Sequence, residues 1–137
     1  MPPNPERLQA LASYRRAMRQ FLAASEAISR SAGVTQQQYQ AMLAVGAWTA
    51  APMTMRDLAE ELLLTHHAAV QLVDRLAKAG LARRLASNAD RRTVELSLTA
   101  EGAGLLENLM LRHQDEMLKR EPALSSSLRR LRRLRGS

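Results

Sequence analysis

Two short helices follow one another in this chain with almost no residues between them. Thr54 stands three residues before Asp57, and Thr65 opens a second stretch that runs to Gly80. A threonine ahead of a helix accepts a hydrogen bond from its first turn, and a glycine just past the last turn adopts the left-handed conformation that ends it. The sequence therefore predicts a helix from Thr54, a tight turn, and a second helix from Thr65 to Ala79 that Gly80 ends, which is the layout of a helix-turn-helix.

The second of these helices has an apolar side and a polar side. Apolar residues recur at spacings of three and four, as they do on a helix that buries one face. The residues between them are polar or charged, and we expect them to face solvent. The inward positions are Ala69, Leu72, Val73, Leu76 and Ala77, and the outward positions are His66, His67, Gln71, Asp74, Arg75 and Lys78.

The hydrophobic period changes from helical to alternating after Gly80. Residues 93–98 place Val94, Leu96 and Leu98 at every second position, as in a half-buried strand, and residues 81–86 precede them as a partner strand. The connection over residues 87–92 contains Ser, Asn and Asp, which favour turns, and ends on two arginines. The pattern predicts a β-hairpin with a positively charged tip, which beside a helix-turn-helix is a wing.

Further helices are predicted on both sides of this core. Residues from about Pro5 to Arg30 have an amphipathic helical period that Gly33 ends, and Thr35 and Gln38 have the spacing of a capping box that starts another helix. We expect a mainly α fold with a small β-hairpin wing. It would comprise an N-terminal helix over residues 1–34, a winged helix-turn-helix over 35–100 and C-terminal helices over 101–137.

The charge balance narrows the class of protein further. Twenty Lys and Arg residues stand against thirteen Asp and Glu, and the net charge of +7 favours a polyanionic partner, either nucleic acid or an anionic membrane. The absence of cysteine excludes disulfides, thiolate metal sites and thiol redox chemistry. No apolar run approaches the roughly 18 residues that cross a bilayer, and the first residues lack a secretory signal, so we expect a cytoplasmic protein.

An enzymatic function is not expected. The chain has no glycine-rich phosphate loop, and His113 with Asp115 and Glu116 has no recognisable set of catalytic partners. His66 and His67 are adjacent, so they point about 100° apart on a helix, which argues against a shared metal ion. We expect no catalytic residue, no metal and no cofactor.

The stretch from Thr54 to Gly102 resembles the core of the MarR (multiple antibiotic resistance regulator) family. The order of helices on either side also fits, so the resemblance covers nearly the whole chain and is loosest at the two ends. It rests on five short pieces of sequence, which are Asp57-Leu58-Ala59, Leu72-Val73-Asp74-Arg75-Leu76, Gly80-Leu81, Asp90-Arg91-Arg92 and Leu98-Thr99-Ala100-Glu101-Gly102.

This resemblance implies a sequence-specific, double-stranded DNA-binding transcriptional regulator with N- and C-terminal dimerisation helices. Members of the family are commonly homodimeric repressors that small aromatic or phenolic acids release, so a homodimer and such an effector are expected. The two-fold symmetry of a dimer predicts a near-palindromic operator. The alternative is a winged-helix protein-interaction module without sequence-specific DNA binding, which would carry acidic or apolar groups where this chain has basic ones.

The residues expected to contact DNA lie on the second helix and on the wing. Gln71 can read adenine in the major groove, and the histidines lie in a first turn, where helix amides attract phosphate. The two wing arginines suit phosphate or minor-groove contacts, or they only keep the tip soluble. The full set is Thr65, His66, His67, Gln71, Arg75, Lys78, Arg83, Arg84, Arg91 and Arg92.

Asp74 is an acid on a helix that is expected to face DNA. It should repel phosphate unless a cation neutralises it. The resemblance implies that an aspartate at this place pairs with a wing arginine and fixes the wing to the helix. We assign this wing-anchor role to Asp74, with Arg91 or Arg92 as its partner.

Two groups of residues have more than one interpretation. Residues 125–135 combine leucines at helical spacing with five arginines, which form a solvated basic face or contact DNA flanks or a membrane. Apolar residues in and after the first two helices line an effector cavity or simply fill the core. These candidate pocket residues are Met18, Phe21, Met42, Val45, Trp48 and Met53.

Overall fold

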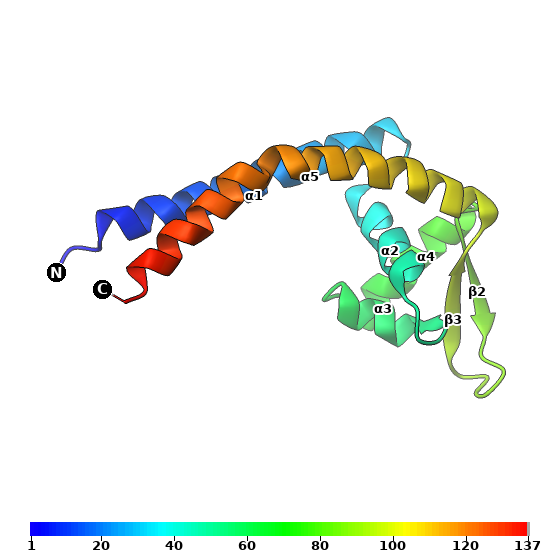
Figure 1. The fold of residues 1–137 in the computed structure, drawn as a ribbon. Coiled ribbons are helices and arrows are strands. Elements are labelled where there is room, and N and C mark those ends of the chain that lie inside the picture. Colours follow the sequence, from blue (N-terminus) through cyan, green and yellow to red (C-terminus); the bar gives the residue numbers. More distant parts are fainter. Residues whose placement is uncertain (137) are drawn as a thin grey trace. The chain divides into compact units, whose positions relative to one another are not determined.

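The computed structural model describes residues 1–136, and it divides the chain into two compact units (Figure 1). The terminal unit combines residues 1–28 with the segment from residue 111 onward, and the central unit consists of residues 29–110. The helices are α1 (Pro5–Ser31), α2 (Gln36–Ala47), α3 (Met55–Glu61), α4 (His66–Lys78) and α5 (Ala100–Leu134), and the strands are β1 (Met53–Thr54), β2 (Ala82–Ala86) and β3 (Val94–Leu98).

Threonine caps start α2, α3 and α4 where the sequence predicts them. The hydroxyls of Thr35 and Thr54 accept hydrogen bonds from the backbone N–H of Gln38 and Asp57, at 3.0 and 3.1 Å. The Gln38 and Asp57 side chains accept in return from the threonine N–H groups, which completes two capping boxes. Thr65 caps α4 in the simpler way, by accepting from the third residue after it. The predicted helix starts are confirmed.

The strands form one antiparallel sheet in the order β1-β3-β2. β2 and β3 are the predicted hairpin, in which Arg84 lies opposite Leu96, and β1 adds a short third strand that pairs Met53 with Leu96 on the other side. A strand of two residues has no hydrophobic period, so no pattern in the sequence could reveal it. A mainly helical chain with this small sheet is a winged helix-turn-helix, as predicted.

The core of the central unit is built around the apolar face of α4. The apolar stripe of this helix is buried, and α4 packs against α2, α3 and β2. Burial also raises the pKa of the Tyr39 phenol in α2 above its usual value, which keeps this side chain neutral in the core. The largest apolar side chains that are almost completely buried in this unit are those of Met42, Met53, Leu58, Leu72, Val73, Leu76 and Leu109.

A tight junction joins the end of α4 to the start of α5. Gly80 has φ of 76°, the left-handed conformation predicted for a residue that ends a helix. Thr99 Oγ1 donates to the Gly80 carbonyl at 2.6 Å and accepts from the Gly102 N–H at 2.9 Å, while the Thr99 N–H donates to the Leu81 carbonyl at 3.1 Å. These bonds explain the sequence from Leu98 to Gly102: its threonine caps α5 and ties it to the turn after α4.

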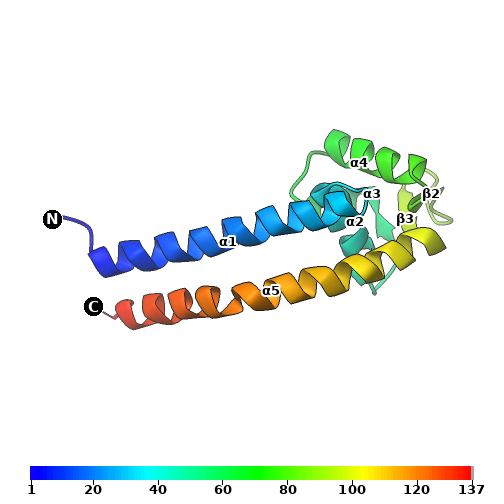
Figure 2. The same ribbon diagram turned by 90° about the horizontal axis from the view of Figure 1, so that it is seen from above.

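The terminal unit is an antiparallel pair formed by most of α1 and the C-terminal part of α5, which run side by side in Figures 1 and 2. Ser25 Oγ and His113 Nε2 lie 2.7 Å apart in a buried hydrogen bond between the two helices. Near the chain ends, Arg7 Nη2 donates to the Leu134 carbonyl at 2.8 Å. Polar contacts therefore link the pair at its middle and at its end.

The segment after residue 100 is one helix of 35 residues rather than the several helices that the sequence suggested. Pro122 lies inside it and cannot donate a backbone hydrogen bond. The helix nevertheless continues, and the hydroxyl of the buried Ser127 donates to the Ala123 carbonyl one turn earlier at 2.9 Å. None of the helices described over residues 1–136 is long and apolar enough to span a membrane.

Candidate nucleic-acid interface

The exposed side of α4 is a single stripe of polar residues. His67, Gln71, Arg75 and Lys78 are all exposed, and their spacings of four, four and three place them on one face of the helix. Arg75 and Lys78 lie in the last turn, where positive charge complements the helix dipole. The stripe thus offers hydrogen-bonding groups near the N-terminus and positive charge near the C-terminus. Such a face can combine base-edge and phosphate contacts.

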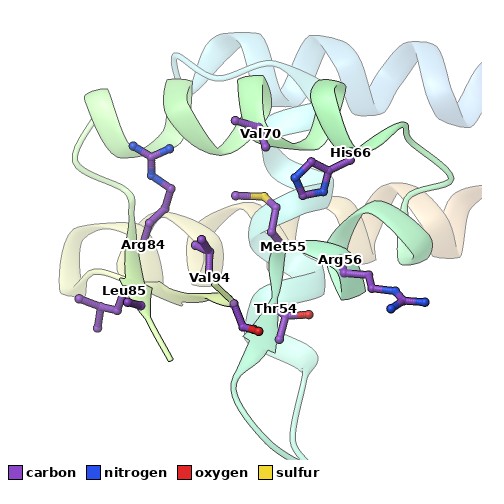
Figure 3. A pocket seen from close by; sticks show the side chains of 10 residues that line it. Thr54, Met55, Arg56, His66, Val70, Arg84, Leu85 and Val94 are labelled. Atoms are coloured by element: carbon purple, nitrogen blue, oxygen red, sulfur yellow. The ribbon is translucent and has the colours of Figure 1, made fainter. Parts of the chain in front are cut away.

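The two adjacent histidines have different surroundings. His66 lies at the start of α4 near Met55 and lines a cavity (Figure 3), while His67 belongs to the exposed stripe. Neighbouring helix positions point about 100° apart, which is why the two side chains separate. The sequence grouped them together, but the structure brings only His67 onto the face with Gln71.

Asp90 and Ser87 shape the tip of the wing. The Ser87 N–H donates to the Thr93 carbonyl at 2.8 Å, and Asp90 Oδ1 accepts from the Arg92 N–H at 3.0 Å, as aspartates in turns commonly do. Arg91 and Arg92 are both exposed. The Arg92 guanidinium lies 3.8 Å from the Asp90 carboxylate, but its side chain is 95% exposed, so solvent screens this ion pair.

Asp74 pairs with Arg84 and not with either tip arginine. Arg84 Nη1 donates to Asp74 Oδ1, and the two side chains are 44% and 40% exposed. Arg84 belongs to β2, whereas Arg92 lies at the tip beside Asp90. The predicted partner of Asp74 was wrong, because the sequence alone does not show which strand residue faces the helix. The ion pair nevertheless joins α4 to the wing.

The other basic residues of the expected set differ in whether an ion pair already occupies their side chains. Arg83 and Arg84 are consecutive in β2, so their side chains leave opposite faces of the strand. Arg84 is taken up by Asp74, but over residues 1–136 no ion pair involves Arg83, Arg75 or Lys78. Among the described residues, these three and Arg91 are exposed without an ion pair, whereas Arg56 and Arg92 pair with Glu60 and Asp90.

A cavity of about 590 Å³ lies between α3, α4 and the hairpin (Figure 3). Its wall is mainly apolar, with basic side chains at its edge. This volume and this mixture of groups suit a small organic ligand. The lining residues are Thr54, Met55, Arg56, His66, Val70, Arg84, Leu85, Ala86, Thr93 and Val94.

None of the six residues predicted to line a pocket belongs to this cavity. Met42 and Met53 are at most 2% exposed and fill the core, and Trp48 is 37% exposed on the surface. Val45 is half-buried in α2, while Met18 and Phe21 are half-buried in the terminal unit. A smaller cavity of about 420 Å³ between α2, β3 and α5 does not include them either, since it is lined by Leu43, Gly46, Ala47, Leu98, Ala103, Leu106, Glu107 and Met110.

One feature of the sequence could have indicated the cavity between α3, α4 and the hairpin. Leu85 is an apolar residue between the two arginines and the turn, and the structure leaves it 60% exposed. Val70 is half-buried at the edge of the apolar stripe of α4 and lines the same cavity. Apolar residues at positions that should face solvent often line binding surfaces.

Charges and titratable groups restrict the chemistry of the central unit. Residues 29–110 contain eight Lys and Arg and eight Asp and Glu, so the positive character near α4 and the wing is local. Within residues 1–136, no three His, Asp or Glu side chains come together as a metal site requires. The basic side chains near α4 and the wing are suited to binding an anionic surface.

Comparison with a family sequence model matches residues 32–93 to the MarR family. The match covers α2, the helix-turn-helix and most of the wing, and it includes every residue of the exposed stripe and both tip arginines. No curated protein matches the chain in sequence.

Solved structures share the fold over most of the chain. AbsC, a MarR family transcriptional regulator from Streptomyces coelicolor, is 19% identical and superimposes with a TM-score of 0.78 over 100% of this chain and 99% of its own. A cysteine-to-serine mutant of MarR from E. coli, complexed with operator DNA, is 23% identical, with a TM-score of 0.72 over 88% and 86%. The M. tuberculosis regulator MOSR, in complex with DNA, is 27% identical, with a TM-score of 0.58 over 70% and 68%.

Proposed function

We propose that this chain is a MarR family transcription regulator, that it binds double-stranded DNA in a sequence-specific manner and that it represses the promoters that it occupies. The observation that carries the proposal is the exposed stripe of His67, Gln71, Arg75 and Lys78 on α4, in a unit that also presents a tip with two arginines. The DNA complexes of MarR and MOSR, which have the same fold, support it. Proteins of this family are regulators and not enzymes, in agreement with the sequence prediction.

The binding species is a homodimer. The terminal unit leaves many large apolar side chains in solvent, which is costly unless a second copy covers them. Such exposure on two long helices is typical of an interface between identical chains. These residues are Leu8, Leu11, Leu22, Leu111, Met117, Leu118 and Leu128, each at least 47% exposed.

Selection of bound sequences from random duplex DNA tests the function and the symmetry together. A dimer whose two recognition helices enter successive major grooves should recover a near-palindrome with half-sites about 10 base pairs apart. A monomer in solution at micromolar concentration, or recovery of no preferred sequence, would refute the proposal.

Gln71 is the residue of the stripe best suited to reading a base, because an amide can bond adenine bidentately. Replacing Gln71 by alanine should relax the preference at one position in each half-site, at a cost of about tenfold in affinity for the best sequence. The measurement is the same selection, followed by titration of the best duplex and of single-base variants. A uniform loss on every sequence would show that Gln71 does not read bases.

The effector is a small aromatic acid that occupies the cavity between α3, α4 and the hairpin. Its ring would lie against the apolar wall near Val70 and Val94. Its carboxylate would bind the Arg84 guanidinium, which forms strong bonds with carboxylates and whose side chain is 44% exposed. The ligand then competes with Asp74 for Arg84, which loosens the wing from α4 and releases the DNA.

Filling this cavity should abolish the response to such an acid. With benzoate as the ligand, Val94→Phe is expected to raise the concentration that half-releases the operator at least about tenfold, because the ring occupies the ligand volume. Ala103→Phe is the matched control, since it adds the same ring to the smaller cavity. The reverse pattern, in which only Ala103→Phe blocks release, would contradict the assignment.

A further inference from the structure

The net positive charge of this protein lies entirely outside the unit that carries the helix-turn-helix. Residues 29–110 are balanced, whereas the terminal unit holds twelve Lys and Arg against five Asp and Glu. Five of the twelve are the C-terminal arginine cluster, which consists of Arg129, Arg130, Arg132, Arg133 and Arg135, and no acid follows Glu121. The basic character that the sequence predicts to attract a polyanion is therefore concentrated at the end of α5.

The cluster lies on α5 away from the leucines that the same turns contain. Leu131 and Leu134 are half-buried, and Arg7 of α1 donates its hydrogen bond to the Leu134 carbonyl. On the other side of the helix, Arg129, Arg130, Arg132 and Arg133 surround an open hollow of about 530 Å³ on the surface. The guanidinium groups thus face solvent, and part of the leucine side faces α1.

No acid compensates these charges. In this part of α5, Glu116 forms ion pairs with Lys119 and Arg120, and over residues 1–136 no ion pair involves the cluster. Like charges three and four residues apart on a helix repel each other. The helix dipole offsets this repulsion only within the last turn. An external anion would therefore stabilise the arginines that precede this turn.

A helix whose apolar side is partly covered favours phosphate on a polymer over a lipid surface. A helix that lies in a membrane interface needs its apolar side free to insert, and here α1 covers part of that side. The planar guanidinium group of arginine can bind two oxygens of one phosphate. Several neighbouring arginines can therefore neutralise successive phosphates of a duplex.

We propose that the C-terminal arginine cluster is a second DNA contact, which binds the phosphate backbone of duplex DNA without sequence preference. This assignment rests on the proposed function, because it adds a sequence-independent part to the same protein's DNA affinity. The stripe on α4 selects the sequence, while the cluster holds the protein on DNA of any sequence.

The test measures binding of the full chain to a random-sequence duplex over a range of KCl concentrations. Arg129→Gln, Arg132→Gln and Arg133→Gln are combined in one variant, since all three side chains are exposed. Each lost phosphate contact lowers the slope of log affinity against log salt by about 0.9, so we expect a decrease of up to about 2.7 per chain. The ratio of operator to random-duplex affinity should stay the same or rise.

A matched variant controls for net charge. Arg15→Gln, Arg16→Gln and Arg19→Gln remove the same three charges from exposed positions of α1 in the same unit. This variant should retain most of the slope. The variant with Arg129→Lys, Arg132→Lys and Arg133→Lys should retain it too, since lysine keeps the charge. Thermal unfolding of all variants checks that the fold is intact.

Three results would overturn the proposal. Equal losses in the two glutamine variants would mean that only net charge matters, and an unchanged slope in the cluster variant would mean that the cluster does not touch DNA. Loss of binding to phosphatidylserine vesicles with unchanged DNA binding would assign the cluster to a membrane. The proposed function fails separately, if the unaltered protein shows no preference among sequences.

Discussion

Replacing Arg91 and Arg92 together by alanine is expected to flatten the salt dependence of operator binding. The two side chains lie on an exposed turn, so a dimer loses up to four phosphate or minor-groove contacts. Counterion release then predicts a slope lower by up to about 3.6 units of log affinity per log salt. The loss of affinity should be greatest at low salt, and titrations by fluorescence anisotropy at several KCl concentrations measure it.

Asp74→Ala separates the charge of the wing from its attachment. This variant keeps both tip arginines but frees Arg84 and removes an acid, so a count of charges alone predicts tighter binding. We expect weaker binding, because α4 loses its ion pair with β2 and the wing is less well positioned. The free energy of unfolding should fall by no more than about 1 kcal/mol, since both partners are substantially exposed. Tighter binding would refute the anchoring role and leave the role of the tip untouched.

The helices of the central unit were predictable because their ends depend on local chemistry. Thr35, Thr54 and Thr65 form caps with residues three positions away, and Gly80 supplies the positive φ that ends α4. Such contacts fall within one turn, so the sequence contains all the information needed. The exposed stripe of α4 was predictable for the same reason, since its spacing is helical.

The features that the sequence did not reveal depend on contacts between distant elements. Asp74 and Arg84 meet because the turn after α4 brings β2 back beside the helix, and the cavity exists because residues from α3, α4, β2 and β3 surround it. The distribution of charge is a similar case. The total of +7 can be read from the sequence, but its confinement to the terminal unit needs the structure that joins the two ends of the chain.

Gly102→Ala is expected to be the most destabilising of the six possible glycine-to-alanine substitutions. A Cβ at this position would lie 2.0 Å from the carbonyl oxygen of Leu81 and 2.9 Å from its carbonyl carbon, both backbone atoms that cannot turn aside. That carbonyl also accepts the Thr99 N–H, so moving it disturbs the junction between α4 and α5. We expect a loss of about 3 kcal/mol in the free energy of unfolding, the upper part of the usual range for overpacking.

Gly104→Ala provides the matched control two residues further along α5. No other side chain or non-local backbone atom lies within 4 Å of a Cβ there, so the substitution should stabilise the helix by about 0.5 to 1 kcal/mol through alanine's higher helix propensity. Thermal unfolding of both variants at one protein concentration makes the comparison, since dimer formation makes the melting temperature depend on concentration. If Gly102→Ala melted as Gly104→Ala does, the close approach of α5 to the turn after α4 would be wrong. A lower melting temperature for Gly102→Ala alone would show that Gly102 is required because only a residue without a Cβ lets α5 begin against the Leu81 carbonyl.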